Sequence, residues 1–201
     1  MNRRAMSKPF LALSLTFAVL AGCNAPSSEA VQPPLAGSTI GGPFTLADTS
    51  GKEVKWDDFK GKYRIVYFGY AWCPDVCPFD MQRIARGLAQ FKSAHPELAN
   101  EVLPIFITVD PERDTPEKVA EFIHAFSDDF VGLTGTPEAI KAAEDAFKVY
   151  ASKGELHEDG SYYVNHSNNT YLMGREGEPI ALLPVDEGPD AVAAELARWI
   201  G

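Results

Sequence analysis

A strand-forming stretch that leads directly into two cysteines constrains this chain more than any other feature. Residues 64–70 read Arg-Ile-Val-Tyr-Phe-Gly-Tyr, a β-branched and aromatic composition that predicts a buried strand. Pro78 then stands just inside a helical pattern, because proline suits a first helical turn. The apolar positions of that pattern recur at spacings of three and four and are Met81, Ile84, Leu88 and Phe91. Cys73 and Cys77 therefore lie between the end of a buried strand and the start of a helix.

Strands and helices alternate along the rest of the chain. The two middle helices are predicted to begin after Thr115 and Thr136, where an N-cap threonine precedes proline. The order of elements predicts an α/β fold, a thioredoxin-like sandwich of the peroxiredoxin-like branch with a central sheet flanked by helices. The other predicted elements are an N-terminal hairpin over 41–52, strands over 102–109 and 131–134, a polar loop over 153–161, a hairpin of strands 162–173 and 179–183, and a last helix over 189–199.

The place of the two cysteines indicates their chemistry. A helix N-terminus exposes unpaired N–H groups and a partial positive charge, which both stabilise a thiolate. We therefore expect Cys73 and Cys77 to be more acidic than free cysteine. The pair can form a disulfide, or it can present two sulfurs to one soft metal ion. A purely structural bridge would close a very small loop and stabilise little.

Of the four histidines, His166 is the candidate for a third metal ligand. In a thioredoxin arrangement its stretch enters the loop that faces the thiols, and imidazole is the usual third ligand beside two thiolates in copper sites. His95 stands at a predicted helix end, where it suits the helix dipole. His124 is interpreted as a surface or core residue of a helix. His157, in the acidic loop, is interpreted as a solvated side chain, with a weak second metal site as the alternative.

Four motifs in order resemble the signatures of the Sco/SenC family. They are Phe-Gly-Tyr-Ala-Trp-Cys-Pro-Asp-Val-Cys-Pro at 68–78, Thr-Val-Asp-Pro-Glu-Arg-Asp-Thr-Pro at 108–116, Val-Gly-Leu-Thr-Gly at 131–135 and Tyr-Val-Asn-His-Ser at 163–167. The resemblance covers roughly residues 40–200 and implies a thioredoxin-like fold. It also implies one copper ion, Cu(I) or Cu(II), held by Cys73, Cys77 and His166. The family helps to assemble the binuclear copper centre of cytochrome c oxidase, as copper donor, as thiol reductant, or as both.

Two positions depart from the family pattern. Asn165 stands where an aspartate is common, which removes a charge beside the expected ligand and bears on how Cu(II) is stabilised. Residues 175–177, Arg-Glu-Gly, replace the usual Pro-Asp-Gly turn, and we expect this change to be harmless. Asp75, between the thiols, is interpreted as a favourable acid in the first helical turn or as a contact for a partner.

The acids around Arg113 form a separate group. Asp110 and Asp114 flank this arginine. They are predicted to form a cap and ion-pair cluster that shapes the loop near the site.

The N-terminus is predicted to be a lipoprotein signal peptide over residues 1–22. Basic residues precede an apolar run that is too short to span a bilayer, and Leu-Ala-Gly-Cys at 20–23 resembles a bacterial lipobox. Cys23 would then be lipidated. Residues 23–39 are predicted to be a flexible tether, and 40–201 the copper-binding domain. The expected location is the cell envelope, facing the periplasm and held to a membrane by the lipid.

Composition and site together limit the function. A net charge of −10 argues against nucleic acid as a partner. The first hypothesis is a copper metallochaperone, whose implied partners are the copper-bearing subunit of the oxidase and a second periplasmic copper chaperone or a thioredoxin-like reductant. The second is a thiol–disulfide oxidoreductase with Cys73 and Cys77 as redox-active thiols. The third, a thiol peroxidase, needs a lone acidic cysteine and a resolving one. Copper requires His166 and redox exchange does not.

Overall fold

The structure is a computed structural model and describes Met1 and residues 31–201. Cys23, nearly all of the predicted signal peptide and the first part of the predicted tether lie outside the described residues. The later part of the tether contains a turn, and the Leu35 N–H donates to the Ile180 carbonyl at 3.0 Å. Backbone contacts with the sheet therefore begin before residue 40. No helix of the described residues has both the length and the apolar character to cross a bilayer.

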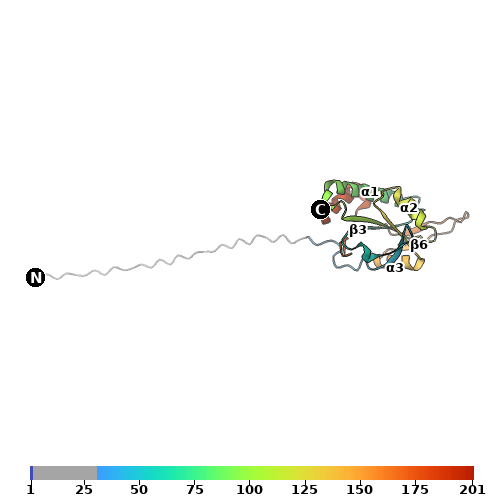
Figure 1. Cartoon of the computed structure of the whole chain (residues 1–201), viewed down its shortest axis with the longest axis horizontal. Coiled ribbons are helices and arrows are strands. Elements are labelled where there is room, and N and C mark those ends of the chain that lie inside the picture. The colour runs from blue at the N-terminus through green and yellow to red at the C-terminus, as the bar shows by residue number, and fades with distance from the viewer. Residues whose placement is uncertain (2–30) are drawn as a thin grey trace. The chain divides into compact units, whose positions relative to one another are not determined.

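A seven-stranded mixed sheet forms the centre of the fold, in the order β2-β1-β5-β4-β3-β8-β9 (Figure 1). Its middle strands are parallel and almost wholly buried, as expected where helices cover both faces. The strands of this sheet are β1 (Thr45–Asp48), β2 (Glu53–Lys55), β3 (Tyr63–Gly69), β4 (Val102–Thr108), β5 (Val131–Thr134), β8 (Thr170–Met173) and β9 (Pro179–Leu182).

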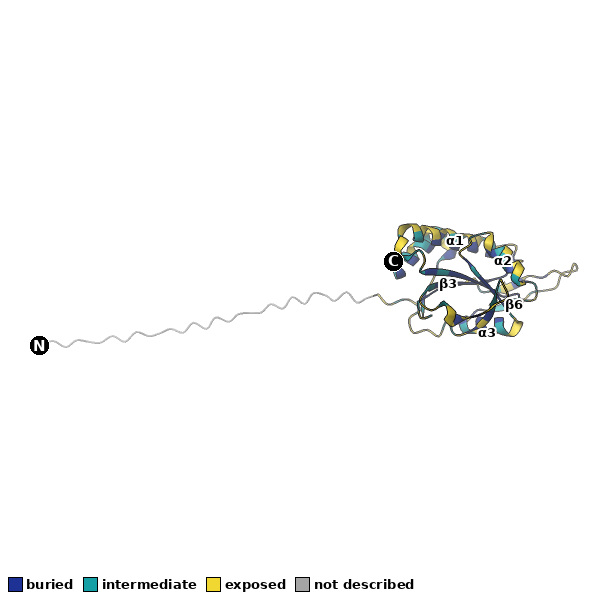
Figure 2. Ribbon diagram, in the orientation of Figure 1, coloured by how far each residue is buried: buried dark blue, intermediate teal, exposed yellow. Residues whose placement is uncertain are grey.

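Helices cover both faces of the sheet. α1 (Val76–Ala94), α2 (Pro116–His124) and α4 (Pro189–Ile200) lie on one side of β3, and α3 (Pro137–Phe147) lies on the other (Figure 1). The helices turn their buried faces to the sheet and their exposed faces to solvent (Figure 2). The hydroxyls of Thr115 and Thr136 accept N–H bonds from the first turns of α2 and α3, which confirms both predicted N-caps. Short 3-10 segments occupy Trp56–Phe59, Pro96–Leu98 and Val185–Glu187.

The prediction of one strand over 162–173 is wrong. Its first part is β7 (Val164–His166), which pairs antiparallel with β6 (Ala151–Lys153) in a separate two-stranded sheet. Its last part is β8, in the main sheet. The chain leaves extended pairing between them, where Ser167 exchanges hydrogen bonds with Tyr150. His166 therefore lies on a hairpin outside the main sheet, which we call the β6–β7 hairpin.

The register of β3 and β4 places the loops that follow them side by side. Gly69 at the end of β3 is paired with Thr108 at the end of β4. The Val109 N–H then donates to the Gly69 carbonyl at 2.8 Å. The cysteine loop after β3 and the loop that leads to α2 thus emerge together at one edge of the sheet.

Candidate metal centre

The loop that carries the first cysteine is held by a buried aspartate. One oxygen of Asp114 accepts the Ala71 N–H at 2.8 Å and the Thr108 hydroxyl at 2.6 Å. Asp114 is fully buried. Asp110, also buried, forms an ion pair with Arg113. These contacts confirm the predicted cap and ion-pair cluster and show that it fixes the approach to Cys73.

The three candidate ligands converge. Cys77 Sγ lies 3.5 Å from His166 Nε2, and the Cys77 N–H points to Cys73 Sγ at 3.5 Å. The two sulfurs and one ring nitrogen all lie within 4.8 Å of one another. In the part of the chain that the structure describes, this is the one group of three or more potential ligands with such geometry. Sequence spacing and fold together bring residues 89 positions apart into one site.

The two thiols differ in access. Cys73 lines an open mouth of about 530 Å³ together with Asp75, Asn165 and His166. Cys77 has no exposed surface and lies behind it. Both cysteines are free thiols, so the disulfide allowed by the sequence is not formed in this structure. An incoming group meets Cys73 first.

The orientation of His166 suits metal binding through Nε2. Its Nδ1 lies 2.9 Å from the Ser167 carbonyl oxygen, which can only accept a hydrogen bond. The ring proton therefore sits on Nδ1, and the lone pair of Nε2 faces the thiols. Tyr70 packs edge-on against the ring, with centroids 5.8 Å apart. Tyr70 and Ser167 lie within the motifs at 68–78 and 163–167, but no pattern in the sequence indicated a role for either.

The acidity expected for both cysteines is found for one. The pKa of Cys73 is lowered, first because the Cys77 thiol donates to it and then because the N–H groups of Cys77 and Asp75 stabilise the thiolate. The pKa of Cys77 is raised, because it donates to Cys73 and is buried. The prediction for Cys77 is therefore wrong. Two sulfurs in contact share one proton, and the buried sulfur retains it.

A stack of charged and aromatic groups fixes the β6–β7 hairpin to the loop after β4. The Tyr162 ring lies between the Arg113 guanidinium, 3.6 Å from its centroid, and the Lys153 ammonium, at 4.0 Å. The Tyr162 hydroxyl donates to Asp110 at 2.9 Å. Because the stack lies just before β7, it sets the position of His166 relative to the thiols.

The remaining histidines lie away from the thiols. His95 caps α1 and stacks on Phe91, as its place at a helix end predicted. His124 is exposed in the last turn of α2. His157 packs edge-on against Tyr163, and among the described residues it belongs to no cluster of potential ligands. The alternative of a second metal site at His157 therefore has no geometric support.

Known proteins share this sequence and fold. The SCO1/SenC family model matches residues 32–201. The chain is 36% identical over 180 residues to Protein SCO1 homolog 2, mitochondrial, of Arabidopsis thaliana, and 35% identical over 158 residues to the Homo sapiens Protein SCO1 homolog, mitochondrial. A structure of Bradyrhizobium japonicum ScoI with copper bound matches at 38% identity and a TM-score of 0.72, covering 80% of this chain and 99% of that one.

The curated relatives are longer than this chain. The matches cover 89% and 79% of this chain, but 62% of the Arabidopsis protein and 52% of the human one. The chain thus spans about half to two thirds of the relatives it matches. The shared part includes the sheet, the cysteine loop and the β6–β7 hairpin, because the family match runs from residue 32 to the last residue, 201.

Proposed function

This chain belongs to the SCO1/SenC family, and on that premise we propose that Cys73, Cys77 and His166 bind one copper ion for delivery to the copper centre of a respiratory cytochrome c oxidase. The observation that carries the proposal is the convergence of two sulfurs and an imidazole nitrogen within 4.8 Å. Cu(I) is soft and favours two thiolates with one nitrogen. The copper-bound Bradyrhizobium relative supports the same choice of metal.

The donor set suits loading from solvent and release to another protein. Cys73 is already biased toward thiolate, whereas Cys77 must lose its proton to become a ligand. Loading therefore releases protons and is favoured as the pH rises. Delivery proceeds by ligand exchange, in which thiolates of the acceptor replace those of this chain. The exposed side chains of Trp72 and Tyr163 beside the site offer apolar surface to such an acceptor.

The acceptor and the location follow from the family and from the N-terminal sequence. We propose that the acceptor is the copper-bearing oxidase subunit. We also propose that a lipid on Cys23 holds the domain at a membrane, facing the periplasm. Several acyl chains would make that attachment firm, whereas one alone would bind reversibly.

A second function is favoured by the asymmetry of the thiols. Cys73 lines the open mouth and is acidic, and Cys77 is protonated behind it, which is the arrangement of an attacking and a resolving thiol. The Cys73 thiolate would attack a disulfide of the target and release one target thiolate. Cys77 would then lose its proton, attack Cys73 in the mixed disulfide and release the second target thiolate. The target gains two electrons and this chain is left with a Cys73–Cys77 disulfide.

Copper titration of the reduced protein tests the first function. The protein carries Cys23→Ser, so that two thiols remain and a lipid is absent. We expect one equivalent of Cu(I) to bind, and Cu(II) to bind with sulfur-to-metal charge transfer. Cys73→Ser or Cys77→Ser should abolish tight binding, because each removes a thiolate. His124→Ala, which changes an exposed histidine of α2, is the matched control for His166→Ala. Tight binding of one equivalent by either cysteine variant would contradict the assignment.

Oxidase activity in cells separates the two functions. His166→Ala leaves both thiols in place, so disulfide exchange should survive while Cu(II) binding falls most. If copper delivery is the task, His166→Ala should impair assembly of the oxidase about as much as Cys73→Ser. If thiol reduction is the task, His166→Ala should support assembly nearly normally while Cys73→Ser fails. Activity is measured in both strains at low and at added copper.

A further inference from the structure

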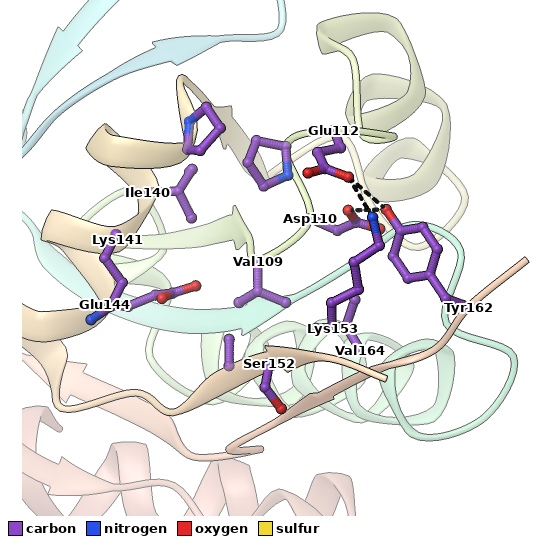
Figure 3. Close-up of a pocket in the computed structure, with 13 residues that line it drawn as sticks. Val109, Asp110, Glu112, Ile140, Lys141, Glu144, Ser152, Lys153, Tyr162 and Val164 are labelled. Carbon is purple, nitrogen blue, oxygen red and sulfur yellow. Dashed lines mark hydrogen bonds and ion pairs between the residues drawn. The ribbon is translucent and has the colours of Figure 1, made fainter. Parts of the chain in front are cut away.

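A small pocket lies beside the β6–β7 hairpin, next to the mouth that Cys73 lines. It has a volume of about 170 Å³ and is bordered by α3, the hairpin and the loop after β4 (Figure 3). Apolar side chains, among them Val109, Ile140 and Val164, form its walls. Sites for drug-sized ligands measure about 300–1,000 Å³. This pocket is therefore matched to a single side chain rather than to a larger molecule.

One carboxyl group in the pocket has no partner in the described part of the chain. Glu144 of α3 is 5% exposed, and its side chain extends into the space between the walls (Figure 3). No hydrogen bond or ion pair joins this carboxyl to another described residue. Burial raises its pKa to about 6. Its oxygens keep some contact with solvent and can be reached from the pocket. A largely buried carboxylate without a hydrogen-bond partner is poorly stabilised in its charged form.

The cations around the pocket are already engaged. Lys153 pairs with Glu112 at 2.7 Å (Figure 3). Lys141 pairs with Asp145. Arg113 is likewise paired, with Asp110. Among the charged residues that line the pocket, Glu144 is the one that takes part in none of these ion pairs. The pocket thus combines apolar walls with one acid that no ion pair or hydrogen bond engages, although the nearby charge of Lys141 acts on it.

We propose that this pocket binds one lysine or arginine side chain of a partner polypeptide. The aliphatic stem would lie against Val109 and Ile140, and the cation would meet Glu144. Such a side chain matches both the apolar walls and the acid, and a net charge of −10 favours a partner with a basic face. A carboxylate and a cation that meet away from water interact more strongly than an exposed pair.

The pocket adjoins the candidate metal centre without being part of it. Val164 contributes to the walls of the pocket and also to the mouth in which Cys73 and His166 lie. A partner anchored at Glu144 would therefore contact the hairpin that carries the histidine. Binding at Glu144 needs neither copper nor free thiols, so its test is independent of the proposed function.

The test is an NMR titration of the copper-free protein carrying Cys23→Ser. The probes are arginine and lysine blocked at both backbone ends, n-butylguanidinium, and blocked norleucine as the uncharged control. Glu144→Gln removes the charge with little change of shape. Glu158→Gln, which changes an exposed acid of the loop after β6, is the matched control for net charge.

We expect the blocked arginine or lysine to shift the signals of Val109, Ile140 and Val164, and blocked norleucine to shift them at least tenfold less at equal concentration. Glu144→Gln should weaken binding at least tenfold, and Glu158→Gln should leave it unchanged. Equal binding by Glu144→Gln, equal binding by norleucine, or no shift at these residues would overturn the proposal. Binding of butylguanidinium with exclusion of both blocked residues would also overturn it, because the pocket would then be a site for small free cations and not for a side chain of a polypeptide.

Glu144→Gln also has a readout that does not involve a ligand. Because Glu144 has no partner within the described structure, the variant should unfold in urea at the same or a higher concentration than the parent. A clear loss of stability in Glu144→Gln would mean that the carboxylate supports the fold. The proposal would then lose its basis.

Discussion

Asp114 makes the stability of this protein depend on pH in a direction opposite to that of most carboxyl groups. Burial raises its pKa from the usual 3.8 to about 6, against the effect of hydrogen bonds from Thr108 and Ala71. Both bonds go to Oδ2, and Oδ1 has no partner among the described residues. A proton can therefore sit on Oδ1 without breaking either bond. The folded state binds this proton more tightly than the unfolded state does.

The size of the effect on the unfolding free energy follows from the change in the pKa of Asp114. A carboxyl whose pKa is raised stabilises the folded state below that pKa, and the gain is lost as the pH rises through it. Between about pH 7.5 and about pH 4.5, a rise from 3.8 to about 6 corresponds to about 2 kcal/mol of unfolding free energy. Asp114→Asn carries no titrating proton, so this contribution should vanish in the variant.

Urea unfolding of the reduced, copper-free protein at these two pH values measures the contribution of Asp114 to the unfolding free energy. The stability of the parent minus that of Asp114→Asn should be about 2 kcal/mol larger at about pH 4.5 than at about pH 7.5. Asp128→Asn, which changes an exposed aspartate, controls for the loss of a charge. A difference that stays constant, or that grows toward neutral pH, would refute the account of Asp114 as a buried and reluctantly ionised acid.

Three further outcomes follow from the geometry. With one equivalent of iodoacetamide at about pH 6, we expect peptide mass spectrometry to find Cys73 modified before Cys77, because Cys73 is acidic and faces the mouth; preferential labelling of Cys77 would contradict this. Gly87→Ala would place a methyl group 2.6 Å from Val192 between α1 and α4, and it should lower the unfolding free energy by about 1–3 kcal/mol in a urea titration while thiol labelling stays unchanged. Cys23→Ser should move the protein from the membrane to the soluble fraction or leave it unprocessed, and normal processing with persistent membrane attachment would exclude a lipid anchor.

Local signals were sufficient for most of the fold. The apolar runs gave β3 and β4, and the Thr-Pro pairs marked the starts of α2 and α3 because capping depends on adjacent residues. β6 gave no such signal, since Ala-Ser-Lys is short and polar. It is a strand because it pairs with β7, a contact that the sequence does not encode locally. The same missing partner made residues 162–173 look like one strand.

In the candidate site, too, some features could be predicted from local sequence, and others depend on contacts made in the folded chain. The strand-to-helix position of Cys73 and Cys77 and the resemblance to the Sco/SenC motifs, which adds His166, identified the three candidates, and the structure brings them together. The raised pKa of Cys77 could not be predicted, because it depends on burial and on the proton shared with Cys73. The sequence also could not predict that Glu144 lacks an ion-pair partner. That depends on which cations of α3, the hairpin and the loop after β4 are already paired with other acids.

The sulfur ligands and the nitrogen ligand lie on different elements, and this bears on how the site can be altered. Cys73 and Cys77 are held by β3, by α1 and by the bonds of Asp114, which lies in the loop between β4 and α2. His166 is held by the β6–β7 hairpin, whose attachment is the stack of Tyr162 between two cations. A change in the hairpin can therefore move the nitrogen ligand while the sulfurs and their shared proton stay in place. Copper affinity and thiol reactivity are in this way separable properties of one site, which is why substitutions at the histidine and at the cysteines are expected to have different effects.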